Sequence, residues 1–356
     1  MTSDVRRIDE GVVYDDPLAK AMTLIPKAPF DPVVALTLVA DTGATDSFDH
    51  VSPSKDHLGR ALALNGLPFL ISVEAVAAAY DAPGLRVSVR AADGAPPPDD
   101  AVMDLAAIWA TRRFALDVDM AAVRAALGTS AQGAFLLERC WPLRPPGLAD
   151  PWSCLLTSII GSRIYPGLSI KLQTALATAY GQTAAFADEE HLIYPSVEQL
   201  AAVTPGDLLD LKFSRQKASY LPAIAQDMLA KPERYDWDHL RALPGVEAVA
   251  ILKELHGVGP WTAGYVALRG LKHPDVFIDE AALRRLVAPD VANPDDLTAE
   301  EMIERTEVYA PYRSFACHYA YMVRFGSARE PEGEREALAP AVPAKKPRQK
   351  KAATTS

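Results

Sequence analysis

The hydrophobic pattern of the chain changes period near residue 100, and this change restricts the fold more than any other feature. Before it, "LRVSVRA" (85–91) alternates, and "RALALNGLPFLISVEA" (60–75) places Asn65-Gly66 between two apolar runs, which predicts a β-hairpin. The β-branched residues of 32–41 predict another strand. From "DDAVMDLAAIWATRRFAL" (99–116) the period is about 3.6, which predicts helices to about residue 327. We therefore expect an α+β fold, with a small N-terminal antiparallel sheet domain (1–105) followed by an all-α domain (106–330).

Capping residues mark several of the expected helices. Asp150-Pro151 is an N-cap and first-turn pair before "WSCLLTSIIGS", and Gly181 follows "PGLSIKLQTALATAY" as a C-terminal residue. Thr204 and Ser214 are expected to cap the next two helices. The short connections between these segments favour a helical bundle.

Composition excludes several classes of protein. No run of 18 apolar residues occurs and the N-terminus lacks the apolar segment of a secretion signal, so we expect a cytoplasmic protein with no membrane partner. The three cysteines, Cys140, Cys154 and Cys317, are too widely spaced for a zinc or iron–sulfur site, and we expect unpaired, buried thiols. No cofactor is expected.

The charge of the chain is unevenly distributed. The net charge is −10, yet the end of the chain carries five basic residues and no acidic one: Lys345, Lys346, Arg348, Lys350 and Lys351. We expect residues 331–356 to form a disordered basic tail, either a non-specific polyanion-binding arm or a solubilising segment. Any nucleic-acid affinity of the acidic remainder must come from a local site.

The segment "LHGVGPWTAGY" (255–265) predicts two helices joined by a glycine hairpin. Gly257 and Gly259 permit backbone conformations closed to other residues, and Pro260 suits the first turn of the second helix. Such a turn directs backbone N–H groups outward at a helix N-terminus, where they attract an anion such as a DNA phosphate. Its carbonyls are compatible with a monovalent cation bridging to that phosphate. The alternative is an ordinary tight turn between helices.

The wider pattern "LxGVGxWTAxYxALRG", followed by "DVF" and an acidic residue, resembles the helix-hairpin-helix DNA glycosylase superfamily, in particular its 3-methyladenine DNA glycosylase II branch. "RPPGLADPWSCLLTSIIGS" (144–162) and "YAPYRSFACHYAYM" (309–322) extend the resemblance over about residues 140–327, and the N-terminal sheet agrees with the extra α/β domain of that branch. The resemblance implies a monomeric base excision repair enzyme acting on double-stranded DNA with a damaged base. It would flip out an alkylated purine and hydrolyse its N-glycosidic bond to leave an abasic site. Its phosphate contacts would come from Gly257, Val258, Gly259 and Thr262.

Hydrolysis of a glycosidic bond needs a carboxylate to stabilise the oxocarbenium character of the transition state. In this branch the catalytic Asp commonly lies three residues before an apolar residue and four before a basic one. In "DVFIDEAALRRLV" (275–287), Leu283 and Arg284 fit those two positions, which selects Glu280. In the more distant endonuclease III relatives the Asp follows an aliphatic residue and lies five residues before an Arg, and this pattern selects Asp279. We retain both as catalytic candidates, with a slight preference for Asp279; otherwise both are acids that complement a helix dipole.

The resemblance also assigns a base pocket and a wedge. Bifunctional relatives carry a nucleophilic lysine where this chain has Trp261, so strand-cleaving lyase chemistry is not expected. Trp261, Tyr265 and Tyr321 match aromatic positions of the base pocket, where a flipped-out cationic purine would stack. Ser162 and Arg163, in "IIGSRIY" (159–165), stand where relatives insert a bulky residue into the gap left by the base.

Three departures from the family leave an alternative open. Ala281 stands where the family's prototype has an aromatic residue after the catalytic acid. Before the wedge position the family usually reads "LGQ", whereas this chain reads "IGS" (160–162). The acidic pair Asp279-Glu280 is also not in the family's usual register. A helix-hairpin-helix protein that binds damaged or abasic DNA without catalysis therefore remains the second hypothesis. Arg215 and Lys217 are expected to contact the DNA backbone or to lie on a solvated face. His256 and His318 are expected to be structural.

Overall fold

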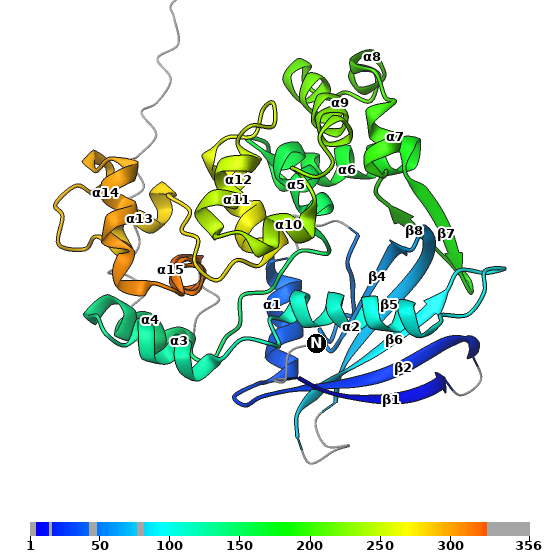
Figure 1. The fold of residues 1–356 in the computed structure, drawn as a ribbon, viewed down its shortest axis with the longest axis horizontal. Helices are drawn as coiled ribbons and strands as arrows, with labels where there is room; N and C mark the ends of the chain where they lie inside the picture. The colour runs from blue at the N-terminus through cyan, green and yellow to red at the C-terminus, as the bar shows by residue number, and fades with distance from the viewer. Residues whose placement is uncertain (1–4, 14–15, 43–47, 77–81, 326–356) are drawn as a thin grey trace, which may run out of the picture.

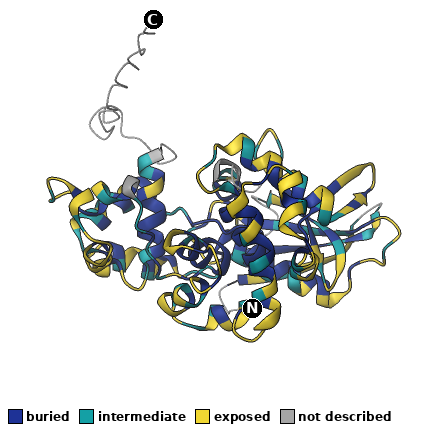
Figure 2. Ribbon diagram, turned by 90° about the horizontal axis from the view of Figure 1, so that it is seen from above, coloured by how far each residue is buried: buried dark blue, intermediate teal, exposed yellow. Residues whose placement is uncertain are grey.

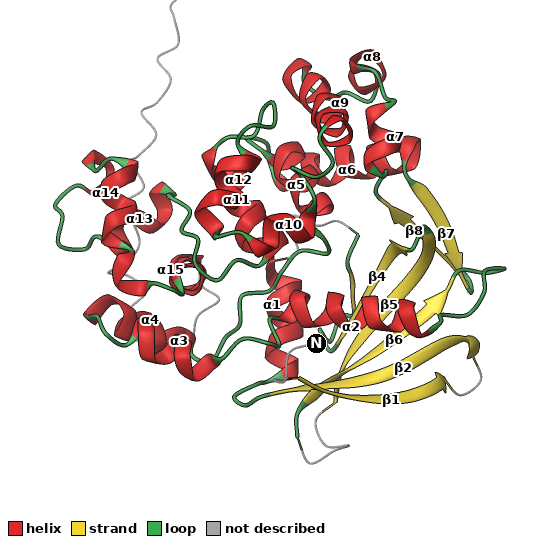
Figure 3. Ribbon diagram, viewed as in Figure 1, coloured by secondary structure: helices red, strands yellow, loops and turns green. Residues whose placement is uncertain are grey.

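The fold of the chain is known from a computed structural model that describes residues 5–13, 16–42, 48–76 and 82–325. The expected basic tail (331–356) lies outside the described residues. A sheet with two helices forms one side of the molecule and a larger set of helices forms the other (Figure 1). Figure 3 shows that strands and helices are largely segregated, as expected for an α+β fold. Among the described helices, none has the length and apolar character needed to span a bilayer.

The N-terminal sheet is antiparallel, with strand order β1-β2-β6-β5-β4-β3. Its strands are β1 (Val5–Val13), β2 (Asp16–Pro26), β3 (His50–Val51), β4 (His57–Leu64), β5 (Leu67–Val76) and β6 (Gly84–Ala91). The predicted hairpin at Asn65-Gly66 is confirmed: both residues have positive φ (50° and 78°), and Leu64 pairs with Leu67 across a two-residue turn.

The strand predicted over residues 32–41 is wrong, because this segment is helix α1 (Pro32–Thr42). Pro32 opens the helix, and the Asp31 carboxylate accepts a hydrogen bond from the Val34 amide (3.0 Å). Leu36 packs in the core of the sheet, whereas Leu38 packs in a second core with the last helices of the chain. A helix that buries residues on two sides has no amphipathic stripe, so only its β-branched composition was visible in the sequence.

Helix α2 (Asp100–Phe114) joins the two parts of the chain. Its N-cap is Asp99, whose carboxylate accepts from the Val102 amide, and its buried residues share the core of the sheet. The expected boundary at residue 105 therefore falls inside a helix that packs against β2 and β6.

The second part of the chain consists mainly of helices. They are α3 (Met120–Leu127), α4 (Ala131–Cys140), α5 (Pro151–Gly161), α6 (Pro166–Tyr180), α7 (Val197–Ala201), α8 (Pro205–Asp210), α9 (Arg215–Ala230), α10 (Trp237–Ala242), α11 (Gly245–Leu252), α12 (Pro260–Tyr265), α13 (Ala281–Val287), α14 (Ala299–Arg305) and α15 (Arg313–Phe325). The predicted N-caps Asp150, Thr204 and Ser214 are confirmed, since each side chain accepts a backbone amide of its own helix. Helix α12 continues without a break into a π-helical stretch, Val266–Leu271.

This region is not purely helical. A hairpin of β7 (Gln182–Phe186) and β8 (Glu189–Ile193) follows α6, which the expected all-α domain did not include. Phe186 and Ile193 form a small apolar cluster with Ala61 of β4, so the hairpin lies against the N-terminal sheet. Five residues per strand are too few to show a clear period of two in the sequence.

Two separate cores stabilise the helices. One contains α5, α6, α9, α11 and α12, and the other contains α3, α4, α13 and α15. Figure 2 shows a buried interior beneath exposed helix faces in both groups. Tyr265 packs against both cores, so it marks the boundary between the two groups of helices.

Candidate nucleic-acid interface and active site

The predicted glycine hairpin lies between α11 and α12. Leu255 and Val258 are buried and anchor the turn, whereas Gly257 and Gly259 are exposed. Gly257 has φ +87°, a conformation that residues with a side chain rarely adopt, and a Cβ on it would lie 2.4 Å from the ring of Tyr220. Any other residue here would therefore strain the backbone and clash with Tyr220. Gly259 is the N-cap of α12, with Pro260 in the first turn.

The four residues predicted to bind phosphate lie in this one turn, but they do not offer equivalent donors. The amide of Val258 already donates to the Leu255 carbonyl (3.0 Å). The first intrahelical bond of α12 is made by Ala263, so helix geometry leaves the amide of Thr262 without an intrahelical acceptor. The hairpin therefore presents N–H groups at a positive helix end, as an anion site requires.

Two of the predicted pocket aromatics are stacked on α12. The rings of Trp261 and Tyr265 are one helical turn apart, with centroids separated by 4.9 Å and planes inclined by 12°. Trp261 remains 41% exposed although it is a large aromatic residue. An exposed ring held by a parallel neighbour is a rigid platform for a further planar group.

A close approach of the backbone brings the acidic segment to this helix. Gly264 lies between Trp261 and Tyr265 on α12, and a Cβ on it would be only 3.2 Å from the Ile278 side chain. Ile278 directly precedes Asp279 and Glu280. The segment that carries the two candidate carboxylates therefore passes close to α12 just before α13 begins.

The two carboxylates have different surroundings. Asp279 accepts hydrogen bonds from Nε (2.9 Å) and Nη2 (2.5 Å) of Arg284, and both side chains are mostly buried. Arg284 also donates to the carbonyls of Pro294 and Leu297, which fixes the guanidinium in place. The hydrogen bonds that Arg284 donates to Asp279 raise the pKa of Arg284 above its ordinary value. Asp279 is thus part of a structural ion pair.

Glu280 is the N-cap residue of α13, but its side chain makes no capping hydrogen bond. Within the described part of the chain its carboxylate forms no ion pair either. Its charge acts on the buried thiol of Cys317 on α15; the pKa of this thiol is about 12, mainly because of burial. Tyr321 lies one turn after Cys317 and is 41% exposed, so the third predicted aromatic is on the face of α15 nearest Glu280.

The predicted wedge lies in the turn between α5 and α6. Helix α5 runs antiparallel to α12 and its π-helical continuation, because Pro151 at its start meets Gly270 and Cys154 meets Tyr265. The end of α5 therefore reaches the hairpin end of α12. Ser162 and Arg163 are both exposed there, and Arg163 has a positive φ of 56°.

Helix α9 connects this turn to the hairpin, a role that was not expected from the sequence. The ammonium group of Lys217 donates to the carbonyls of Ile160 (2.6 Å) and Ser162 (2.9 Å). Tyr220, three residues later, contacts Gly257 and packs edge-on against His256 at 4.9 Å. The expectation that Lys217 contacts DNA or solvent is wrong, since it is 8% exposed, and burial lowers its pKa. Its place on the apolar face of α9 with Leu221 and Ile224 was the signal available in the sequence.

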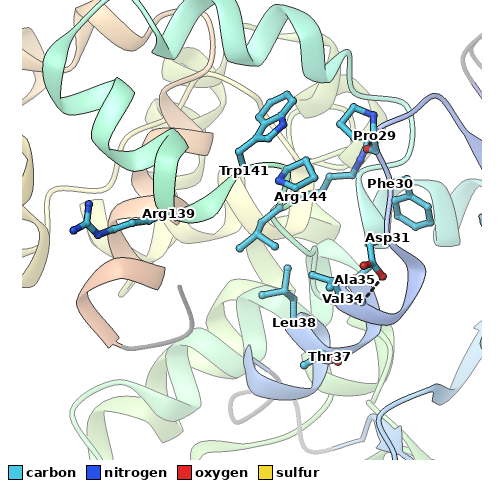
Figure 4. Close-up of a pocket in the computed structure, with 12 residues that line it drawn as sticks. Pro29, Phe30, Asp31, Val34, Ala35, Thr37, Leu38, Arg139, Trp141 and Arg144 are labelled. Atoms are coloured by element: carbon cyan, nitrogen blue, oxygen red, sulfur yellow. Dashed lines mark hydrogen bonds between the residues drawn. The ribbon is translucent and has the colours of Figure 1, made fainter. Parts of the chain in front are cut away.

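A pocket elsewhere in the molecule shares no residue with this site. A pocket of about 370 Å³ lies between α1 and the segment after α4, lined by Phe30, Leu38, Trp141 and Arg144 among others (Figure 4). None of its lining residues is a predicted site residue. Among the described residues no group of three or more His, Cys, Asp or Glu side chains is arranged to hold a metal ion. The three cysteines, all within the described residues, are buried and form no disulfide, as predicted.

Residues 170–311 match the model of the HhH-GPD superfamily of base excision DNA repair proteins. A DNA-3-methyladenine glycosylase of Bacillus subtilis (strain 168) is 27% identical over 189 residues, which cover 53% of this chain and 62% of that protein. DNA-3-methyladenine glycosylase 2 of Escherichia coli (strain K12) is 28% identical over 178 residues, which cover 49% and 58%. The matched regions thus span about three fifths of the length of these relatives.

Solved structures show the same fold. A 3-methyladenine DNA glycosylase from Archaeoglobus fulgidus has a TM-score of 0.68 at 16% identity, with 85% of this chain and 98% of that chain covered. An 8-oxoguanine glycosylase/lyase from Clostridium acetobutylicum, in complex with double-stranded DNA, has a TM-score of 0.62 at 14% identity, with 90% and 99% covered. At these identities the likeness shows a shared architecture that includes the N-terminal sheet.

Proposed function

The helical part of this chain belongs to the HhH-GPD superfamily of base excision DNA repair proteins, and we propose that the chain is a monofunctional DNA glycosylase that removes alkylated purines from double-stranded DNA. One observation carries this proposal: Trp261 is exposed and stacked on Tyr265, and the helix that bears both rings contacts Ile278, two residues before Glu280, whose carboxylate forms no ion pair among the described residues. The relatives named DNA-3-methyladenine glycosylase support the choice of substrate.

In the proposed reaction the hairpin holds a backbone phosphate while the damaged base leaves the duplex. The base is proposed to stack on Trp261, in a site that includes Tyr265 and Tyr321. A purine alkylated on a ring nitrogen carries a positive charge, and stacking on an electron-rich indole favours it over a neutral base. The exposure of Trp261 and its support by Tyr265 suit this role.

Glu280 is proposed as the reacting carboxylate, although the sequence analysis slightly favoured Asp279. When the C1′–N bond breaks, its electrons go to the cationic purine, which departs neutral and needs no acid. The carboxylate of Glu280 stabilises the positive charge left on the sugar and takes the proton of the water that adds to C1′. Asp279 would first have to leave Arg284, at the cost of two charged hydrogen bonds.

Trp261 supports hydrolysis without lyase activity. The family resemblance puts a nucleophilic lysine of bifunctional relatives at this position, and an indole cannot form a Schiff base with C1′. The product would be an intact strand with an abasic site.

A base-release assay tests the proposal. Purified chain is incubated with duplex DNA methylated on purine ring nitrogens, and free bases are separated from the polymer and identified by mass. We expect methylated purine in the soluble fraction and strand breaks only after alkali treatment. No release from alkylated, deaminated or oxidised duplexes would reject the enzyme. Tight binding to abasic duplex in that case would support a non-catalytic damage-binding protein. The ion pair of Asp279 with Arg284 is the observation that favours this alternative.

A further inference from the structure

The turn between α5 and α6 carries an aromatic side chain to which the proposed function gives no role. Tyr165 is 64% exposed, more than Trp261 or Tyr321. Its ring lies over Gly167, where a Cβ would come within 3.2 Å of it, so the first turn of α6 leaves space for the ring. Its carbonyl accepts the amides of Leu168 and Ser169, which ties its backbone to the start of the helix.

Side-chain hydrogen bonds hold the turn in the residues just before Arg163. Lys217 fixes the carbonyls of Ile160 and Ser162, and the Ser162 hydroxyl donates to the Ile159 carbonyl (2.9 Å). Arg163 then reverses the chain in a left-handed conformation. The exposed Arg163 and Tyr165 are therefore presented by a fixed scaffold.

The same scaffold places this turn beside the hairpin. Lys217 contacts the turn and Tyr220 contacts Gly257, and three residues of α9 correspond to a rise of about 4.5 Å. A duplex with its phosphate on the hairpin therefore passes over the α5–α6 turn as well. An aromatic ring in that position would face the base pairs of such a duplex.

We propose that Tyr165 enters the duplex beside Arg163 and stacks on the base that is left unpaired in the strand opposite the damaged nucleotide. Arg163 occupies the vacated space, and the ring replaces the lost stacking on the opposite base. Every nucleobase offers a π-face, so the contact tolerates any opposite base. This inference rests on the proposed function, because it needs a duplex from which one base has been removed.

Binding measurements on abasic duplexes test the inference without requiring base release. Affinities are measured by fluorescence anisotropy for three duplexes of one sequence: intact, with one stable abasic analogue, and with a second analogue directly opposite the first. The Tyr165→Ala variant should bind the single-abasic duplex about tenfold more weakly than the unmodified protein, which corresponds to one base–aromatic stack. It should bind the intact and double-abasic duplexes as the unmodified protein does, because neither offers an unpaired opposite base.

Two control variants separate stacking from other effects. Tyr165→Phe keeps the ring and should retain the affinity. Ile170→Ala removes an exposed apolar side chain from the same helix and should change none of the three affinities. An equal loss on the single- and double-abasic duplexes, no loss at all, or no preference of the unmodified protein for abasic DNA would overturn the inference. Base release with an unaffected Tyr165→Ala variant would reject this contact alone, whereas the expected binding pattern without base release would reject only the enzymatic proposal.

Discussion

Asp279 and Glu280 are adjacent acids, yet replacing each by its amide should change different properties of the protein. Asp279→Asn removes the charge from a carboxylate that accepts two hydrogen bonds from Arg284. Hydrogen bonds to charged groups contribute roughly 1.5–3 kcal/mol each, and an asparagine oxygen keeps one of them in weakened form. The pair retains some contact with water, so we expect the free energy of unfolding to fall by about 1–2 kcal/mol.

Glu280→Gln should leave stability within about 0.5 kcal/mol of the unmodified protein, because no capping bond is lost at this position. Its rate of base release should fall by about 10²–10³-fold, the usual effect of removing one group that stabilises charge in a transition state. The Asp279→Asn variant, measured where it is folded, should retain most of the rate.

The assay combines denaturant unfolding with base release under single-turnover conditions. Arg284→Met provides a matched control, since it breaks the same ion pair from the other side and should destabilise the protein without replacing either acid. The opposite pattern, with Asp279→Asn folded but inactive and Glu280→Gln active, would refute the reasoning. It would mean that the ion pair opens when DNA binds.

Three further variants test the architecture around the site. Gly257→Ala should lower the free energy of unfolding by roughly 1–3 kcal/mol in a denaturant titration, because Gly257 has a positive φ and the new Cβ would lie 2.4 Å from the Tyr220 ring. Gly259 has a negative φ and open space around it, so Gly259→Ala should leave the free energy of unfolding unchanged. Lys217→Met should lower the free energy of unfolding by about 2–4 kcal/mol and weaken binding to abasic duplex, since two carbonyls lose a charged donor. Arg215→Met, on the exposed start of the same helix, should leave the free energy of unfolding unchanged. His318 is buried near two cations, which holds its pKa well below 6.5, so it stays neutral in the folded protein but takes up a proton in the unfolded chain. The free energy of unfolding should therefore decline as the pH falls below about 6.5. His318→Leu should flatten that decline in melting curves recorded from pH 7.5 to 5. An unchanged slope would assign the pH dependence to other groups.

Local chemistry made parts of the fold predictable from the sequence. The turn at Asn65-Gly66 needs two positive φ angles, and few residue pairs adopt them readily. The caps at Asp150 and Ser214 each accept an amide three residues away, so both partners lie close together in the sequence. The glycine hairpin and Trp261 could be located for the same reason.

Features that depend on distant partners could not be predicted in this way. Helix α1 is buried against both the sheet and the last helices, which removes the periodicity that identifies a surface helix. Lys217 reaches carbonyls more than fifty residues away, and nothing near it in the sequence reveals them. The choice between Asp279 and Glu280 was undecided because each count fitted one group of relatives, whereas the ion pair with Arg284, on which our preference for Glu280 rests, is formed by residues brought together in the fold.

Helix α9 gives the site a property that neither DNA-facing turn has alone. The α5–α6 turn rests on Lys217 and the hairpin rests against Tyr220, so one rigid helix sets the distance between the turn that would enter the duplex and the turn that would hold its phosphate. Two separate flexible loops would each lose conformational entropy on binding DNA. Here that cost is met during folding by the burial of α9, whose apolar face lies in the same core as α5 and α12. The burial of a lysine, which is unfavourable in itself, is offset by the two carbonyls at the end of α5 that would otherwise lack a donor.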